Sequence, residues 1–260
     1  MSSEFNPKEF YSTYPQKVIS RPGYPARAAY KSWLLWKLYG KQVQQSLGEI
    51  KQYADIGGCF GFGANALSYH IAKSQKNNPE THVFEISEDF IRIGEELFPR
   101  LHFHSEAFEL WNGNPQNFDL VSLFDLVEHL PDPKPLLKSV ASRSKFVLLK
   151  TPLETTGKWR GSRPPHKKGK DHPDGHVQFF TQKYYESLLS ECGLKVLKFK
   201  IVRSIIPKGS ENILNPEKDK PSGFNPKVLA WWVLYQIPFP IARKIIGQGD
   251  HLSLCKSMLV

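Results

Sequence analysis

A glycine-rich turn and a later carboxylate are the first residues whose types and spacing could do chemistry. The apolar run YADI at 53–56 leads into DIGGCFGFG at 55–63, and Glu85 comes 24 residues after Gly61. Glycines at a strand-to-helix turn let a ligand approach the backbone closely. A carboxylate at the end of the next strand can accept hydrogen bonds from both hydroxyls of a ribose. These features predict a nucleoside-containing ligand, and no Walker lysine follows to indicate phosphoryl transfer.

A basic segment between Lys158 and Lys170 is the second feature. It holds six Lys or Arg residues and no acid. One interpretation is a phosphate clamp for an anionic substrate, and the other is a solvated surface loop. The candidate substrate-binding residues are Arg160, Arg163, Lys167 and Lys168.

A histidine- and aspartate-rich stretch follows this segment. It contains His166, Asp171, His172, Asp174 and His176. Their spacing matches no standard zinc pattern, and DHPDGH is typical of a turn. We therefore expect no metal ion.

Charge is unevenly distributed over the 260 residues. The formal net charge is +10, yet residues 53–133 alone carry −9, while 134–194 and 195–260 carry +7 each. An acidic site for a cationic ligand and a basic surface for an anionic substrate would produce this pattern, as would chance placement of solvated charge. The 40% apolar content excludes a largely disordered chain. Three cysteines without CxxC spacing, and no secretion signal, favour a cytoplasmic protein.

Apolar runs and amphipathic stretches alternate from Gln52 onward, which predicts a parallel sheet with helices on both faces. The run at 118–124 is apolar enough for a strand buried on both faces. The expected strands are 53–56, 82–86, 101–104, 118–124, 145–150, 194–202 and 251–259. The expected helices are 26–40, 64–74, 88–98, 133–142 and 182–192. We divide the chain into a helical cap (1–50), a core (51–206), an inserted cap or lid (207–249) and a last strand of the core sheet (250–260).

Two long motifs in the right order make the chain resemble the class I S-adenosylmethionine-dependent methyltransferases of the type 11/23 kind. FDLVSLFDLVEHLPDP at 118–133 is similar to the family's FDxVxxxxVLEHLxDP, and HVQFFTQKYYESLLSECGLKV at 176–196 is similar to HxRFFTxxxLxxLLxxxGF. The turn at 55–61 resembles DxGxGxG, with Cys59 in place of the middle glycine. The resemblance implies a Rossmann-like doubly wound α/β sheet of seven strands and S-adenosylmethionine as cofactor. The cofactor-binding residues that it implies are Asp55, Gly57, Gly58, Cys59, Gly61, Glu85, Ile86, Glu106, Ala107, Phe124 and Asp125.

Two histidines are the candidate catalytic bases. His129 comes just after the fourth expected strand, and His176 opens the FFT segment at the same sheet edge. A hydroxyl acceptor must lose a proton during methyl transfer, which either imidazole could take. A purely structural role is the other interpretation. The sequence alone does not separate the two residues.

The resemblance implies a methyltransferase, and we expect O-methylation of a small or glycan-like anionic acceptor. The alternatives are an RNA methyltransferase, which the basic second half favours, and a module that binds the cofactor without turnover. An NAD-dependent dehydrogenase is a weaker interpretation of the same turn. The apolar run at 228–241 is too short to span a bilayer. It is expected to form a buried cap helix or to lie at a membrane surface.

Overall fold

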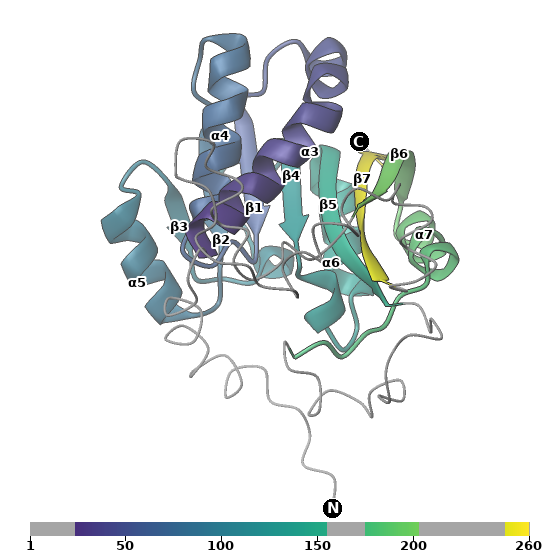
Figure 1. The fold of residues 1–260 in the computed structure, drawn as a ribbon. Helices are drawn as coiled ribbons and strands as arrows, with labels where there is room; N and C mark the ends of the chain where they lie inside the picture. Colours follow the sequence, from purple (N-terminus) through teal and green to yellow (C-terminus); the bar gives the residue numbers. More distant parts are fainter. Residues whose placement is uncertain (1–23, 155–174, 203–247, 260) are drawn as a thin grey trace, which may run out of the picture.

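A single mixed sheet of seven strands forms the centre of the protein (Figure 1). The computed structural model describes residues 24–154, 175–202 and 248–259. The strand order is β3-β2-β1-β4-β5-β7-β6. The strands are β1 (Gln52–Ile56), β2 (Glu80–Phe84), β3 (His102–His104), β4 (Phe118–Phe124), β5 (Ser144–Glu154), β6 (Leu194–Val202) and β7 (Gln248–Ser257).

The first five strands are parallel, and β7 runs antiparallel between β5 and β6. The strand order reverses at β1, which pairs with β2 on one side and β4 on the other. Loops that leave the carboxyl ends of β1 and β4 therefore diverge, and sheets of this topology bind ligands between such loops, at the place that we call the crevice. The predicted doubly wound fold is confirmed, but the expected parallel sheet is a mixed one, because β7 runs antiparallel to its neighbours.

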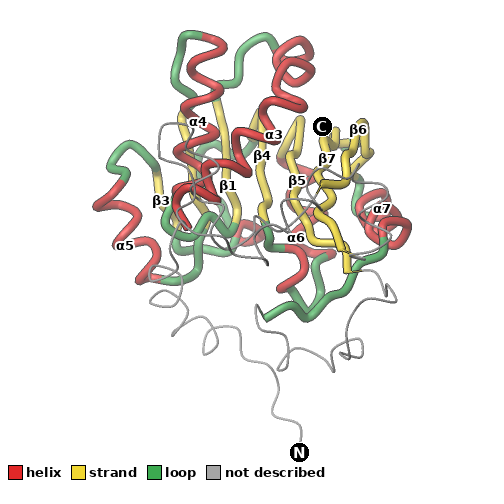
Figure 2. Tube along the Cα trace, viewed as in Figure 1, coloured by secondary structure: helices red, strands yellow, loops and turns green. Residues whose placement is uncertain are grey.

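Helices cover both faces of the sheet (Figures 1 and 2). On one face, α3 (Tyr24–Leu47) and α4 (Phe62–Gln75) pack on the strands. On the other, α6 (Lys134–Arg143) and α7 (Gln182–Glu191) do so, together with the short 3-10 helix η1 (Phe108–Leu110). The helix α5 (Glu88–Leu97) lies along β3, and a second 3-10 helix, η2 (Val127–His129), follows β4.

Each central strand buries side chains in both layers, because successive residues of a strand point to opposite faces. In β4, Leu120 joins the core under α3 and α4, while Val121 joins the core under α6 and α7. Tyr53 and Ala54 of β1 divide in the same way. The expectation that 118–124 is buried on both faces is confirmed.

Two elements continue several residues beyond the ends that the sequence predicts. The helix expected to end at Gly40 continues to Leu47, because Leu35, Tyr39 and Val43 are buried one turn apart on the sheet. The strand expected to end at Lys150 continues to Glu154, because β7 pairs with it from Phe146 to Glu154. By contrast, β2 ends at Phe84, so Glu85 lies just beyond the strand.

Several predicted segments lie outside the described residues. These are most of the N-terminal segment before Tyr24, the basic segment with its four candidate residues, and the inserted cap up to residue 247, which includes 228–241. The division into caps and core therefore stays a prediction. Within the described residues, α3 shares one apolar core with β1, β4, β5 and β7.

Candidate active site

The glycine-rich turn after β1 needs glycine at three positions, two for their backbone conformation and one for lack of space. Gly57 and Gly61 have φ of +69° and +82°, in the left-handed region. A Cβ on Gly58 would lie 2.7 Å from Cγ1 of Val83, too close for any side chain. Cys59 also has a positive φ, +50°. The turn thus keeps its left-handed step where the family's usual glycine is absent, with the strain carried by a cysteine.

Glu85 is held against this turn from the neighbouring strand. Its Oε2 accepts a hydrogen bond from the amide of Cys59 at 3.0 Å. Its Oε1 accepts from the amides of Ile86 at 2.8 Å and Ser87 at 3.0 Å. Burial raises the pKa of Glu85, although these three amides oppose the rise. The carboxylate is therefore fixed in orientation at the crevice and retains capacity to accept further hydrogen bonds.

Asp55 is a buried carboxyl beneath the turn. Oδ1 accepts a hydrogen bond from the Ser122 hydroxyl of β4, whose oxygen lies 2.7 Å from the Tyr53 hydroxyl. Burial raises the pKa of Asp55 to about 7, and the charge of Glu85 adds to this, while the Ser122 hydrogen bond opposes it. An acid with such a pKa changes charge near neutrality, so a cationic ligand close by would favour its ionised form.

Asp125, at the carboxyl end of β4, is the centre of a buried ionic cluster. It pairs with Lys31 from α3 and with Lys150 from β5. Lys150 also pairs with Asp250 of β7, at 3.0 Å. Burial would raise the pKa of Asp125, but Lys150 and Lys31 outweigh it and hold that pKa well below its usual range. The cluster thus connects the loop after β4 to α3, β5 and β7. Asp125 itself has a left-handed backbone, with φ of +54°.

His129 and His176 come together, as their expected positions at one sheet edge imply. Their ring centroids are 5.0 Å apart and the rings are nearly perpendicular. The Gly175 carbonyl lies 3.3 Å from Nδ1 of His129. The amides of Val177 and Gln178 both donate to the backbone carbonyl of Glu128 at 2.9 Å. The loop carrying His176 is therefore anchored on η2.

Glu128 lies beside the two imidazoles and is fully buried. Neither carboxylate oxygen accepts a hydrogen bond from another residue within the described parts of the chain. Burial, followed by the charge of Asp125, raises its pKa well above the usual range. A buried carboxyl without hydrogen bonds is energetically costly and asks for an explanation.

The remaining predicted cofactor residues surround the same crevice. Phe124 ends β4, and Ile86, 47% exposed, directly follows Glu85. Glu106 and Ala107 lie in the loop between β3 and η1, Glu106 exposed and Ala107 half-buried. The structure thus gathers the loops after β1, β2, β3 and β4 at one edge of the sheet.

Sequence reasoning missed four charged residues of this edge: Lys31, Glu128, Lys150 and Asp250. Lys31 and Asp250 lie on elements 94 and 125 residues from Asp125, with no spacing signal to connect them. Glu128 lies within the motif at 118–133. Its carboxylate among the apolar residues of LVEHL was the signal that could have indicated a buried acid.

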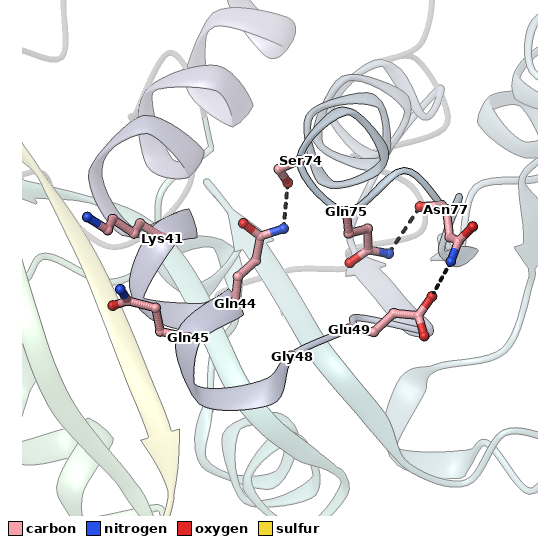
Figure 3. A pocket seen from close by; sticks show the side chains of 8 residues that line it. All are labelled: Lys41, Gln44, Gln45, Gly48, Glu49, Ser74, Gln75 and Asn77. Carbon is pink, nitrogen blue, oxygen red and sulfur yellow. Dashed lines mark hydrogen bonds between the residues drawn. The ribbon is translucent and has the colours of Figure 1, made fainter.

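A separate polar pocket lies between the end of α3 and the end of α4 (Figure 3). Hydrogen bonds there join Gln44 to Ser74 at 2.6 Å and Asn77 to Glu49 at 2.7 Å. Because α4 starts at the glycine-rich turn and ends at this pocket, the pocket lies toward the opposite edge of the sheet. It holds none of the residues described above. Among the described helices, none is long and apolar enough to cross a membrane.

Comparison with known proteins agrees with this geometry. A family model described as "Methyltransferase domain" matches residues 55–198, more than half of the chain. No curated protein sequence matches the chain.

Solved structures share the fold at low sequence identity. A putative sarcosine dimethylglycine methyltransferase from Galdieria sulphuraria is 15% identical, with a TM-score of 0.53 over 84% of this chain and 85% of that one. An O-methyltransferase from a trans-AT PKS multienzyme of Brevibacillus brevis, in complex with S-adenosyl-L-homocysteine, is 15% identical, with a TM-score of 0.51 over 96% and 75%. The [4+2]-cyclase SpnF is 12% identical, with a TM-score of 0.54 over 85% and 80%. The chain therefore belongs to the methyltransferase-domain family, and is a class I methyltransferase whose cofactor is S-adenosylmethionine.

Proposed function

We propose that the protein transfers a methyl group to a hydroxyl oxygen of a small anionic acceptor, of glycan-like or phosphate-bearing character. The observation that carries the choice of oxygen is the His129–His176 pair beside the loop after β4. A hydroxyl must lose its proton as the new bond forms, and imidazoles at the crevice suit that task. The O-methyltransferase domain among the structural neighbours supports the same choice.

Cofactor binding is assigned to the loops after β1 to β4. The turn formed by Asp55, Gly57, Gly58, Cys59 and Gly61 would lie beneath the cofactor, and Glu85 would accept hydrogen bonds from the ribose hydroxyls. Ile86, Glu106 and Ala107 would contact the adenine, and Phe124 and Asp125 the methionine portion. When bound, the cofactor supplies a methyl group on a positively charged sulfur.

The residues fit this ligand in charge. Asp55 and Glu85 are buried carboxyls whose pKa values are raised by burial, and neither has a lysine or arginine within ion-pair distance in the described ranges. A cationic cofactor would supply the missing positive charge. The amides of Cys59, Ile86 and Ser87 hold Glu85 ready for neutral hydroxyl donors.

Substituting Glu85→Ala tests the cofactor site. Loss of two hydrogen bonds to a charged acceptor costs about 3 kcal/mol, so the Kd for S-adenosylmethionine should rise roughly 150-fold in calorimetric titration. Glu95→Ala, an exposed carboxylate on α5, is the matched control and should bind as the wild type does. Because Glu85 also supports three amides, thermal unfolding of each variant is measured alongside. An unchanged Kd in a folded Glu85→Ala variant would remove Glu85 from the cofactor site.

Methyl transfer from labelled cofactor to a panel of hydroxyl compounds tests the acceptor. Sugar phosphates and nucleotide-linked sugars should be methylated, and their uncharged counterparts should react more slowly. Replacing Lys167 and Lys168 by Ala should raise KM for the anionic acceptor with little change in kcat. RNA forms a separate arm of the panel, because the positive charge of residues 134–260 favours that alternative. Methylation of RNA and of no small molecule would replace the proposed acceptor.

A further inference from the structure

Glu128, His129 and His176 form a cluster that the proposed reaction leaves partly unexplained. One ligand atom from each side chain lies within 4.8 Å of the other two. His129 Nε2 is 3.9 Å from Oε1 of Glu128. Two metal–ligand bonds of about 2.1 Å each span at most about 4.2 Å, so an ion fits between these two atoms. His176 is half-buried, and a shift of under about 1 Å in its side chain would complete the set.

Glu128 supplies an independent reason to expect a cation. Its side chain is fully buried, and no other described residue donates a hydrogen bond to either carboxylate oxygen. Among the described residues, the two nearby lysines, Lys31 and Lys150, already pair with Asp125 and Asp250. A cation beside Glu128 would favour its ionised form, because buried charges are paired or coordinate metals.

His129 makes the kind of hydrogen bond that usually orients a metal-binding histidine. A carbonyl oxygen can only accept a hydrogen bond, so the contact with Gly175 places the imidazole proton on Nδ1. Nε2, which lies 3.9 Å from Oε1 of Glu128, is then the nitrogen without a proton. Metal-binding histidines typically donate their other N–H to a carbonyl or carboxylate in this way. The two amide hydrogen bonds from Val177 and Gln178 hold the His176 loop in place.

We propose that Glu128, His129 and His176 bind one divalent first-row ion, of the Zn²⁺ or Mn²⁺ kind, at the acceptor side of the crevice. Two imidazoles and one carboxylate favour such ions over Ca²⁺, which prefers an all-oxygen set. The sequence expectation of no metal considered the spacing of histidines and aspartates around 166–176. The proposed site instead joins that segment's last histidine to two adjacent residues after β4.

The ion's role in catalysis rests on the proposed O-methylation, whereas its binding does not. Bound to the ion, an acceptor hydroxyl becomes more acidic and loses its proton to solvent. A lone pair of the oxygen then forms the O–CH₃ bond. The S–CH₃ bond breaks with its electron pair remaining on sulfur, which leaves neutral S-adenosylhomocysteine. In this arrangement His129 and His176 still promote the loss of the hydroxyl proton, but they do so as ligands of the ion, which replaces their role as bases in the proposed function.

The test is metal binding by the full chain without cofactor or acceptor. After chelation and dialysis, titration with Co²⁺ should give one equivalent bound, with visible absorption bands from nitrogen ligation, and Zn²⁺ should displace it. His176→Asn and His129→Asn should each weaken Co²⁺ binding by at least about 10-fold. Glu128→Gln should weaken Co²⁺ binding to a similar extent. If this buried substitution impairs folding, the variant of the half-buried His176 still tests the site. His102→Asn, an exposed imidazole near Glu80, is the matched control and should bind as the wild type does.

Two results would overturn the inference. One is no stoichiometric ion in the folded wild type, and the other is wild-type affinity for Co²⁺ in both His176→Asn and His129→Asn. Methyl transfer that chelation leaves unaffected would remove the ion's catalytic role and return the histidines to the role of bases, with O-methylation intact. Stoichiometric binding without any methylated hydroxyl would leave the metal site standing and remove the proposed acceptor instead.

Discussion

Cofactor binding is expected to release a proton from Asp55. In the free protein, burial raises the pKa of this carboxyl to about 7, so it is largely protonated at pH 5 to 6. In the proposed complex the sulfonium and the ammonium of the cofactor lie near the turn above Asp55, and positive charges nearby favour the ionised acid. The acid therefore has a lower pKa in the complex than in the free protein, and affinity must rise with pH across this range.

The size of the effect follows from that shift. If Asp55 is ionised throughout in the complex, Kd is proportional to one plus the ratio of protonated to ionised Asp55 in the free protein. Between pH 5 and pH 7 that quantity falls about 50-fold, equivalent to roughly 2.3 kcal/mol. Near pH 6, about 0.9 proton should be released per cofactor bound.

Calorimetric titration with S-adenosylmethionine at several pH values, in two buffers of different ionisation enthalpy, measures both quantities. Asp55→Asn keeps an oxygen for the Ser122 hydroxyl and removes the titrating group, so its Kd should vary much less with pH. Glu95→Gln, on the exposed side of α5, should retain the wild-type slope. A slope that persists in Asp55→Asn, or no proton release by the wild type at pH 6, would refute the assignment of Asp55.

Three further predictions concern stability. The pKa of Asp55 is raised in the folded state, so protonated Asp55 stabilises the fold below about pH 4, and this contribution is lost as the pH rises through about 7. In urea unfolding, the free energy of unfolding of the wild type, relative to that of Asp55→Asn, should fall by about 4 kcal/mol as the pH rises through this range. Gly94→Ala places a Cβ 2.4 Å from Cζ of Phe103, so its free energy of unfolding should fall by about 1–3 kcal/mol, and wild-type stability would contradict the packing of α5 on β3. Tyr39→Phe removes the hydroxyl that donates to the Leu252 carbonyl at 2.9 Å in a buried site, with an expected loss of about 1–2 kcal/mol by the same measurement.

The positions of the strands along the chain and the ligand edge could be predicted because their signals are local. An apolar run such as 118–124 indicates a strand buried on both faces, and β4 is that strand. The glycine turn at 55–61 indicated where the chain must bend sharply, and positive φ values occur there. Parallel strands joined by helices then bring the loops after β1, β2 and β4 to one edge.

Element ends and long-range charge pairs could not be predicted, because tertiary contacts decide them. Gly40 was expected to end the helix, but it lies under the Trp36 ring, and a Cβ on it would be 2.5 Å from Cδ2 of that ring. Burial of the following turn extends the helix to Leu47, and Gly48, with φ of +75°, ends it. The pairing of Lys31 with Asp125 joins residues 94 apart and depends on the finished packing of α3.

The position of β7 constrains how the protein can be made. In the sheet β7 lies between β5 and β6, although it is synthesised after both of them. Until Gln248–Ser257 is synthesised, β5 and β6 lack their shared partner, and unpaired strand edges invite pairing with other chains. The Tyr39–Leu252 hydrogen bond, between residues 213 apart, forms only then as well. We expect the complete sheet to assemble late and slowly, since such non-local pairings delay folding, and a nascent chain lacking β7 to depend on chaperones.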